Sequence, residues 1–143
     1  MKSSTGVIRR LNLSDMPAQM PNGIPMSSDI ATAARRGGLR AVRLKAVLSI
    51  LEARFHEPGF SAQKLAAAGG LSERYVNELL FEAGASFTTR LTELRLRKAA
   101  DLLAHREGRI SDIAFACGFN DLSYFNRCFR RRFGLTPTAA RGK

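Results

Sequence analysis

The segment "IAFACGFNDLSYFNRCF", residues 113–129, decides the fold, because a second version of it occurs earlier in the chain. Residues 65–80 read "LAAAGGLSERYVNELL", and the two segments align with one extra residue in the later copy. The matched pairs are Leu65 with Ile113, Ala66 with Ala114, Gly70 with Gly118, Val76 with Phe125, Asn77 with Asn126 and Leu80 with Phe129. An internal repeat of this kind indicates a duplicated supersecondary unit.

Each copy predicts a short helix, a tight turn and a capped second helix. The small alanine in the first helix allows a close helix crossing, and the glycine supplies the left-handed backbone that the turn needs. Ser72 is placed to cap the second helix of the first copy, and Asn120 or Asp121 that of the second. This order of elements is the helix-turn-helix signature.

The segment between the copies predicts a linking helix over residues 86–105, about 30 Å long. Its apolar residues change sides along the helix, from Phe87, Leu91 and Leu94 to Leu96, Ala99, Ala100 and Leu103. A helix that packs on one core throughout has no need of such a change, so we expect it to hold one subdomain at each end. Ser86 begins this linking helix, and Ser61, Ser111 and Thr136 are the expected caps of the remaining helices. No segment alternates like a strand, so the class is all-α.

The chain therefore divides into a tail and one domain. Residues 1–38 are basic and contain Pro and Gly with little apolar periodicity, so we expect disorder there, apart from a short, weak helix possible at 28–36. Residues 39–143 form the helical domain. Its parts are subdomain one at about 41–85, the linking helix at about 86–105 and subdomain two at about 108–141.

Charge points to the partner. The chain has 23 basic and 12 acidic residues, a formal net charge of +11, which favours nucleic acid first and an anionic membrane surface second. In "FNRCFRRRFG", residues 125–134, Phe125, Phe129 and Phe133 share one helical face. Arg127, Arg130 and Arg131 point the other way, and Arg132 lies at the apolar edge, where we expect it to extend along that edge.

Other classes find no support in the sequence. Paired acids, a nucleophile with a base, a metal-ligand cluster and a phosphate loop are all missing, so we expect neither an enzyme nor a cofactor or metal. Cys117 and Cys128 fit no zinc or redox spacing and are expected to be buried thiols. No apolar run approaches a membrane span or a signal peptide, which favours a cytoplasmic, nucleoid-associated protein that does not bind membranes.

The repeat resembles the DNA-binding domain of the AraC/XylS family of bacterial transcription regulators. "ISDIAFACGFNDLSYFNRCFRRRFGLTP", residues 110–137, is similar to the family signature I-x-x-I-A-x-x-x-G-F, then S-Y-F, then F-R-R-x-F-G-x-T-P. "LSERYVNELLFEAGASF", residues 71–87, resembles the first unit. The resemblance implies seven helices, two helix-turn-helix subdomains and a recognition helix from each in a major groove. It also implies an activator that binds promoter DNA and contacts RNA polymerase.

The resemblance also implies residue roles. The base-contacting candidates are Arg74, Asn77 and Glu78 in the first recognition helix and Ser123, Asn126 and Arg127 in the second. The phosphate-contacting candidates are Ser72, Tyr124, Arg130 and Arg131. Arg reads guanine and Asn reads adenine, whereas Glu78 stands where many members have Arg and repels phosphate. For Asn77 and Glu78, ordinary surface polarity is an open alternative.

The tail is too short for the sensor domain that most members carry. The sequence therefore predicts either a monomeric regulator without a small-molecule ligand or a fragment of a longer, ligand-sensing one. A nonspecific basic nucleic-acid binder, and a protein-interaction module that has lost DNA binding, are the remaining alternatives.

Overall fold

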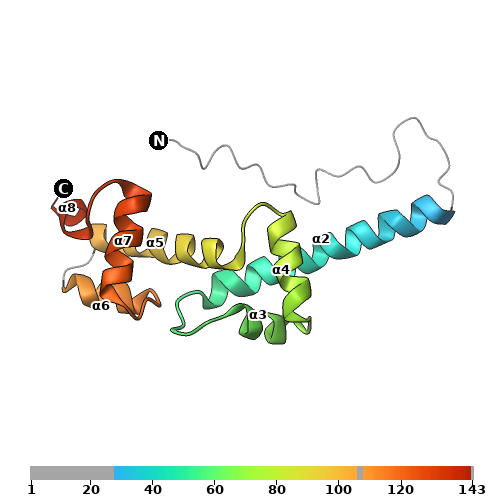
Figure 1. Ribbon diagram of the computed structural model, residues 1–143, viewed down its shortest axis with the longest axis horizontal. Helices are drawn as coiled ribbons and strands as arrows, with labels where there is room; N and C mark the ends of the chain where they lie inside the picture. Colours follow the sequence, from blue (N-terminus) through green and yellow to red (C-terminus); the bar gives the residue numbers. More distant parts are fainter. Residues whose placement is uncertain (1–27, 106–107, 143) are drawn as a thin grey trace. The chain divides into compact units, whose positions relative to one another are not determined.

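The structure, a computed structural model, describes residues 28–105 and 108–142 (Figure 1). These ranges form seven α-helices and no strand, so the all-α class is confirmed. The helices are α2 (Ser28–Arg54), α3 (Ala62–Gly69), α4 (Glu73–Glu82), α5 (Phe87–His105), α6 (Ile110–Ala116), α7 (Leu122–Phe133) and α8 (Pro137–Arg141). The chain divides into two compact units, Met1–Val42 and Arg43–Lys143, and all the sites discussed below lie in the second unit.

Helix α2 begins at Ser28, so it includes the short helix that the sequence allowed at residues 28–36 and continues through Gly37 and Gly38. The segment contains Ala31, Ala33 and Ala34, which favour helix, and adding turns to an existing helix avoids the unfavourable nucleation step. Gly37 and Gly38 weaken such a helix by about 1 kcal/mol each without ending it. The disorder expected for residues 1–27 falls outside the described residues.

The first core joins α2, α3, α4 and the start of α5. Its buried residues are Val47, Leu51, Phe60, Leu65, Ala66, Val76, Leu79, Leu80, Phe87 and Leu91. Leu65 and Ala66 of α3 lie opposite the apolar face of α4, as the helix-turn-helix pattern predicts. Burial of these side chains supplies the main driving force for this half of the domain.

The second core joins the rest of α5 to α6 and α7. Its buried residues are Leu96, Ala99, Leu103, Ile113, Ala114, Cys117, Phe119, Phe125, Cys128 and Phe129. Aromatic rings form a continuous series in it: the ring centroids of Phe119 and Phe125 lie 5.0 Å apart, and those of Phe129 and Phe133 lie 4.7 Å apart. Each half of helix α5 therefore contacts a different core. This confirms the prediction that its apolar residues change sides because the helix holds one subdomain at each end.

Side-chain caps fix where the second helix of each helix-turn-helix unit begins. Ser72 Oγ accepts a hydrogen bond from the Tyr75 amide at 3.1 Å, and Asp121 Oδ1 accepts one from the Tyr124 amide at 3.0 Å. The expected cap at Ser111 is wrong, because α6 begins at Ile110 and Ser111 lies inside it. Starting two residues earlier than a Ser111 cap would require allows Ile110 to pack against the second core.

Candidate nucleic-acid interface

Helix α7 separates an apolar face from a basic one. Phe125, Cys128 and Phe129 are buried, and they fix which side of the helix faces the solvent. The opposite side exposes five of the residues predicted to contact DNA, namely Ser123, Asn126, Arg127, Arg130 and Arg131. Because the buried face is locked into the second core, the rotation of this polar face about the helix axis is set by packing.

Tyr124 lies at the edge of this face and is held between two neighbours. Its ring centroid is 6.2 Å from that of Phe119, and the Arg127 guanidinium lies 5.7 Å from the centre of its ring. Stacking of this kind restricts the rotamers of Arg127 while leaving its N–H groups accessible. An arginine ordered in advance loses less conformational entropy when it binds.

Arg132 does not belong to the free basic face, and the expectation that it extends along the apolar edge is incomplete. Its Nε and Nη2 donate to the two carboxylate oxygens of Glu93 on α5 at 2.8 and 2.9 Å, while its guanidinium also stacks on Phe133 at 4.8 Å. Burial alone would raise the pKa of the Glu93 carboxyl, but hydrogen bonds from Arg132 and Arg97 outweigh burial and hold this pKa below its ordinary value. This pair fastens α7 to the linking helix.

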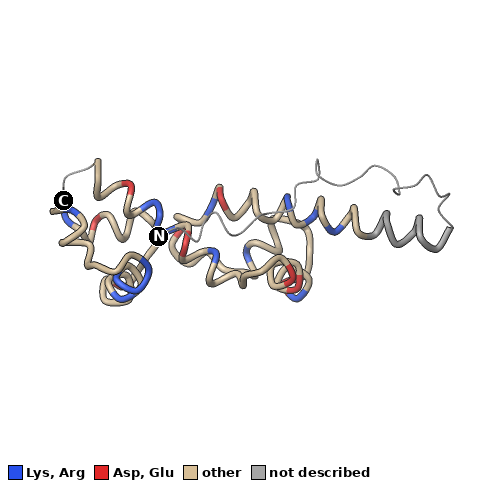
Figure 2. Tube along the Cα trace, turned by 90° about the horizontal axis from the view of Figure 1, so that it is seen from above, with Lys and Arg blue, Asp and Glu red and all other residues tan. Residues whose placement is uncertain are grey.

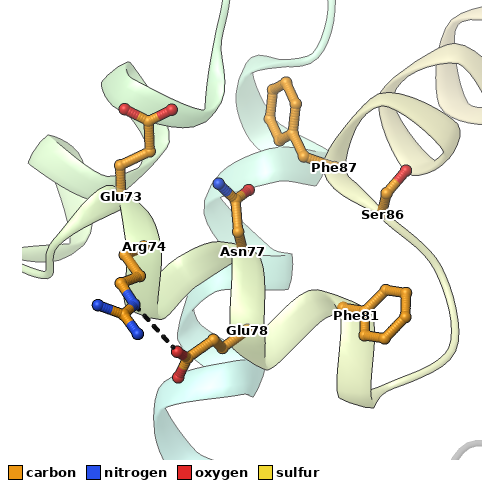
Figure 3. Close-up of a pocket in the computed structure, with 7 residues that line it drawn as sticks. All are labelled: Glu73, Arg74, Asn77, Glu78, Phe81, Ser86 and Phe87. Carbon is orange, nitrogen blue, oxygen red and sulfur yellow. Dashed lines mark ion pairs between the residues drawn. The ribbon is translucent and has the colours of Figure 1, made fainter.

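Helix α4 presents the first set of predicted residues. Ser72, Arg74, Asn77 and Glu78 are all exposed, on the side away from Val76, Leu79 and Leu80. Arg74 Nε lies 3.4 Å from a Glu78 carboxylate oxygen, with side chains 90% and 48% exposed (Figure 3). An exposed pair of this type contributes little stability, so both side chains can be released at small energetic cost.

Phe81 is a surface residue that the sequence analysis did not identify. It is 76% exposed and follows Arg74, Asn77 and Glu78 at helical spacings of seven, four and three residues. With Glu73, Ser86 and Phe87 these residues line an open hollow (Figure 3). Its helical spacing from Arg74 and Asn77, which the family resemblance had already named, could have identified it.

The two recognition helices differ strongly in charge. The sequence of α4 contains Glu73, Glu78 and Glu82 against a single arginine. The sequence of α7 contains four arginines and no acid. In Figure 2, where both helices are seen nearly end-on, α7 carries blue and no red, whereas α4 carries red as well as blue. The electrostatic attraction for a polyanion is therefore concentrated on the second subdomain.

Both helices face the same side of the residue 43–143 unit. In Figure 1, α4 crosses in front of α2, and α7 crosses in front of α5, with similar directions. In Figure 2, turned by 90°, both lie along one edge of this unit. One side of the domain thus offers two exposed helix faces at once.

The part of the chain that the structure describes contains no group of three or more His, Cys, Asp or Glu residues suited to a metal ion. Neither Cys117 nor Cys128 forms a disulfide, and both are buried, as expected. Among the described residues, no helix is both long and apolar enough to span a bilayer.

Comparison with known proteins finds the same helix-turn-helix domain in a protein family and in solved structures. The chain matches the model of a helix-turn-helix domain family over residues 65–143. A solved AraC-type transcriptional regulator from Chromobacterium violaceum superposes with a TM-score of 0.65 at 31% identity, covering 71% of this chain and 91% of the other. The DNA-binding domain of AdpA, solved in complex with a target DNA, gives 0.63 at 27% identity, covering 69% and 89%.

The chain is also similar in sequence to curated transcriptional activators. The transcriptional activator NphR of Rhodococcus sp is 30% identical over 148 residues, covering 92% of this chain and 44% of its own length. The activator RhaS of Escherichia coli is 37% identical over 98 residues, covering 68% and 35%. The chain thus spans less than half the length of these relatives. On the match to the family model and the two helix-turn-helix units, the chain belongs to the AraC-type helix-turn-helix family.

Proposed function

We propose that this protein is a sequence-specific, double-stranded DNA-binding transcription regulator that inserts α4 and α7 into successive major grooves. The observation that carries this proposal is the exposed face of α7, where Asn126 and Arg127 lie beside Arg130 and Arg131 with no acidic residue on the helix. The position of α4 and α7 on one side of the domain supports the use of two grooves (Figure 2). The complex of the AdpA domain with DNA supports the choice of partner.

In the second subdomain, Arg127 and Asn126 are the proposed base readers, with Ser123 beside them. Arg pairs with the O6 and N7 of guanine, and Asn pairs with the N6 and N7 of adenine. Tyr124, Arg130 and Arg131 are proposed to contact phosphates and thereby fix the register of the helix.

In the first subdomain, Asn77, Arg74 and Glu78 are the proposed base readers, with Ser72 on the phosphate. Glu78 and Arg74 form an exposed pair, so the helix offers an acceptor and a donor next to each other. Glutamate accepts from the cytosine N4 amino group, which makes a C·G pair the expected target.

The names of NphR and RhaS as activators support a role in activating transcription from a promoter, with RNA polymerase as the protein partner. We propose that the chain binds DNA as a monomer in the cytoplasm and takes no small-molecule ligand itself. Its coverage of less than half of the relatives' length supports the alternative of a DNA-binding part of a longer, ligand-sensing regulator.

The test is selection of binding sites from random duplex DNA at about 150 mM salt. Two short blocks about one helical turn apart are the expected result. A single block would restrict base reading to one helix. No enriched motif, together with affinity that depends on salt alone, would contradict the proposal and favour a nonspecific binder.

Arg127→Ala is expected to weaken binding to the selected site by about 1–3 kcal/mol and to relax the preference at one base pair. The physical reason is the loss of a bidentate contact that an ordered guanidinium makes with one guanine. Binding titrations on the selected site and on the three variants that change the contacted base pair measure both effects. Unchanged affinity and unchanged preference would show that this helix face does not read bases.

Arg130→Ala is the matched comparison, because it removes the same side chain from the same helix. It is expected to weaken all duplexes about equally and to reduce the slope of log affinity against log salt by about one unit. Titrations over a salt series on selected and scrambled duplexes provide the measurement. A loss confined to the selected site would instead make Arg130 a base reader.

A further inference from the structure

Arg95 occupies the point where helix α5 changes from one core to the other. Its neighbour Leu94 packs against the first core, and its other neighbour Leu96 is buried in the second. The Arg95 side chain leaves α5 at this junction and is only partly exposed. It lies far from the exposed faces of α4 and α7 in sequence, and no role in binding follows from its position on the helix alone.

The guanidinium of Arg95 joins α5 to the segment that follows α2. Its Nε donates to the Phe55 carbonyl oxygen at 2.7 Å, and its Nη2 donates to the Glu57 carbonyl oxygen at 2.9 Å. These acceptors lie 40 and 38 residues earlier in the chain. Two parallel bonds from one rigid fork define an orientation as well as a distance.

The acceptor segment is itself fastened to the first subdomain. Arg54 donates to both carboxylate oxygens of Glu57, at 2.9 and 3.1 Å, and its guanidinium lies 4.9 Å from the ring centroid of Phe60. Phe60 is buried in the first core, and Phe55 packs against that core. The Phe55 and Glu57 carbonyls therefore move with the first subdomain.

The other side of Arg95 touches the turn of the second subdomain. Its guanidinium lies 5.9 Å from the ring centroid of Phe119, which is buried in the second core. A Cβ placed on Gly118 would lie 2.6 Å from Arg95 Nε and 2.9 Å from the Phe55 carbonyl oxygen. The turn of the second helix-turn-helix unit thus packs directly against the hydrogen bond between Arg95 and Phe55.

The first unit offers an internal comparison. Gly70 occupies the matching place in its turn, also with positive φ, but a Cβ there would meet nothing within 4 Å. The close approach at Gly118 is therefore no requirement of the helix-turn-helix turn. It results from the packing of this turn against Arg95 and the Phe55 carbonyl at the junction of the two subdomains.

We propose that Arg95 is a positioning residue that sets the separation and relative rotation of α4 and α7, and through them the spacing of the two DNA half-sites. The inference rests on the proposed two-groove function. One inserted base pair moves a half-site by about 3.4 Å and rotates it by about 35° around the duplex. When the two hydrogen bonds of Arg95 hold the subdomains in one relative orientation, the domain binds tightly at one spacing of the half-sites. When α5 alone joins the subdomains, the domain binds several spacings with similar affinity.

The test compares Arg95→Ala and Arg95→Lys with Lys98→Ala, which removes a charge from an exposed position on the same helix. Binding is measured on duplexes that carry both selected blocks with the native spacer, with one base pair removed and with one added, and on duplexes with each block alone. Thermal unfolding by circular dichroism confirms that each variant melts cooperatively.

The wild type and Lys98→Ala are expected to lose about a hundredfold in affinity when the spacer changes, because the two contacts no longer form together. Arg95→Ala is expected to bind each single block as the wild type does, to bind the native spacing more weakly and to differ less than about threefold among the three spacers. Arg95→Lys keeps the charge but lacks the planar guanidinium that donates both hydrogen bonds. We therefore expect its spacing preference to lie between those of the wild type and Arg95→Ala. A folded Arg95→Ala protein that keeps the full spacing preference would overturn the inference.

A second readout needs no DNA. Spin labels at Glu82→Cys on α4 and Arg131→Cys on α7 report the distance between the recognition helices, while the native cysteines are buried. We expect a narrow distance distribution in the wild type and a broad one with Arg95→Ala. A narrow distribution in both would overturn the inference. If the wild type selects no second block while the distribution broadens in Arg95→Ala, the two-groove function fails and the positioning role stands.

Discussion

Replacing Gly118 with alanine is expected to lower the free energy of unfolding by about 3–6 kcal/mol, whereas Gly70→Ala is expected to lower it by about 1–2 kcal/mol. Both glycines have positive φ, +107° at Gly118 and +69° at Gly70, so both substitutions introduce backbone strain. Only at Gly118 does the new methyl group also collide with Arg95 and with the Phe55 carbonyl. Arg95 then has to leave its two carbonyl acceptors, and the lost hydrogen bonds add to the strain.

Urea unfolding of the two variants and the wild type, followed by circular dichroism, measures the difference. The pair is well matched, because the two positions correspond in the repeat and receive the same substitution. Equal losses at the two sites would mean that the junction relaxes around the methyl group. A loss at Gly70 larger than at Gly118 would contradict the described packing altogether.

Phe125→Ala is expected to destabilise the protein by about 3–5 kcal/mol. The Phe125 side chain is 0% exposed, and its ring centroid lies 5.0 Å from that of Phe119 and 5.7 Å from that of Phe129. Its removal leaves a cavity at the centre of the second core, bordered by rings that cannot collapse without moving α7. Thermal and urea unfolding measure the loss.

Phe81→Ala is the control, since it deletes the same side chain from a position that is 76% exposed. It is expected to change stability by less than about 0.5 kcal/mol. Native-state amide exchange adds a local readout: with Phe125→Ala, the amides of α6 and α7 are expected to lose protection before those of α3 and α4. Uniform loss across both halves would show that the two cores unfold as one unit.

Much of the fold was predictable because it depends on local patterns. The alanine, glycine and cap residues of each copy specify a helix-turn-helix unit within a window of about twenty residues. The change of sides along α5 predicted two cores, and the aromatic face of α7 predicted its buried side. Ser111 was misplaced because a serine near a helix start resembles a cap whether or not the chain uses it.

The candidate interface was predictable in part, for the same reason. The exposure of Asn77, Asn126 and Arg127 follows from helical spacing opposite an apolar face. The hydrogen-bond partners of Arg132 and Arg95 do not follow from helical spacing, because they lie 38 to 40 residues away in the chain. The partners of Arg95 are also backbone carbonyls, which every residue carries. Phe81 was missed because the candidate residues of α4 were taken from the family resemblance, and helical spacing was not applied to the rest of the helix.

The unequal charge of the two recognition helices has a consequence for the order of events in binding. A polyanion attracts the arginines of α7 over a longer range than it attracts α4, whose acids oppose phosphate. We therefore expect α7 to make the first encounter, at a rate that falls with salt, and α4 to engage afterwards at short range. On this kinetic scheme, the association rate depends on α7, and the lifetime of the complex depends on whether α4 binds a half-site with the base sequence that it recognises.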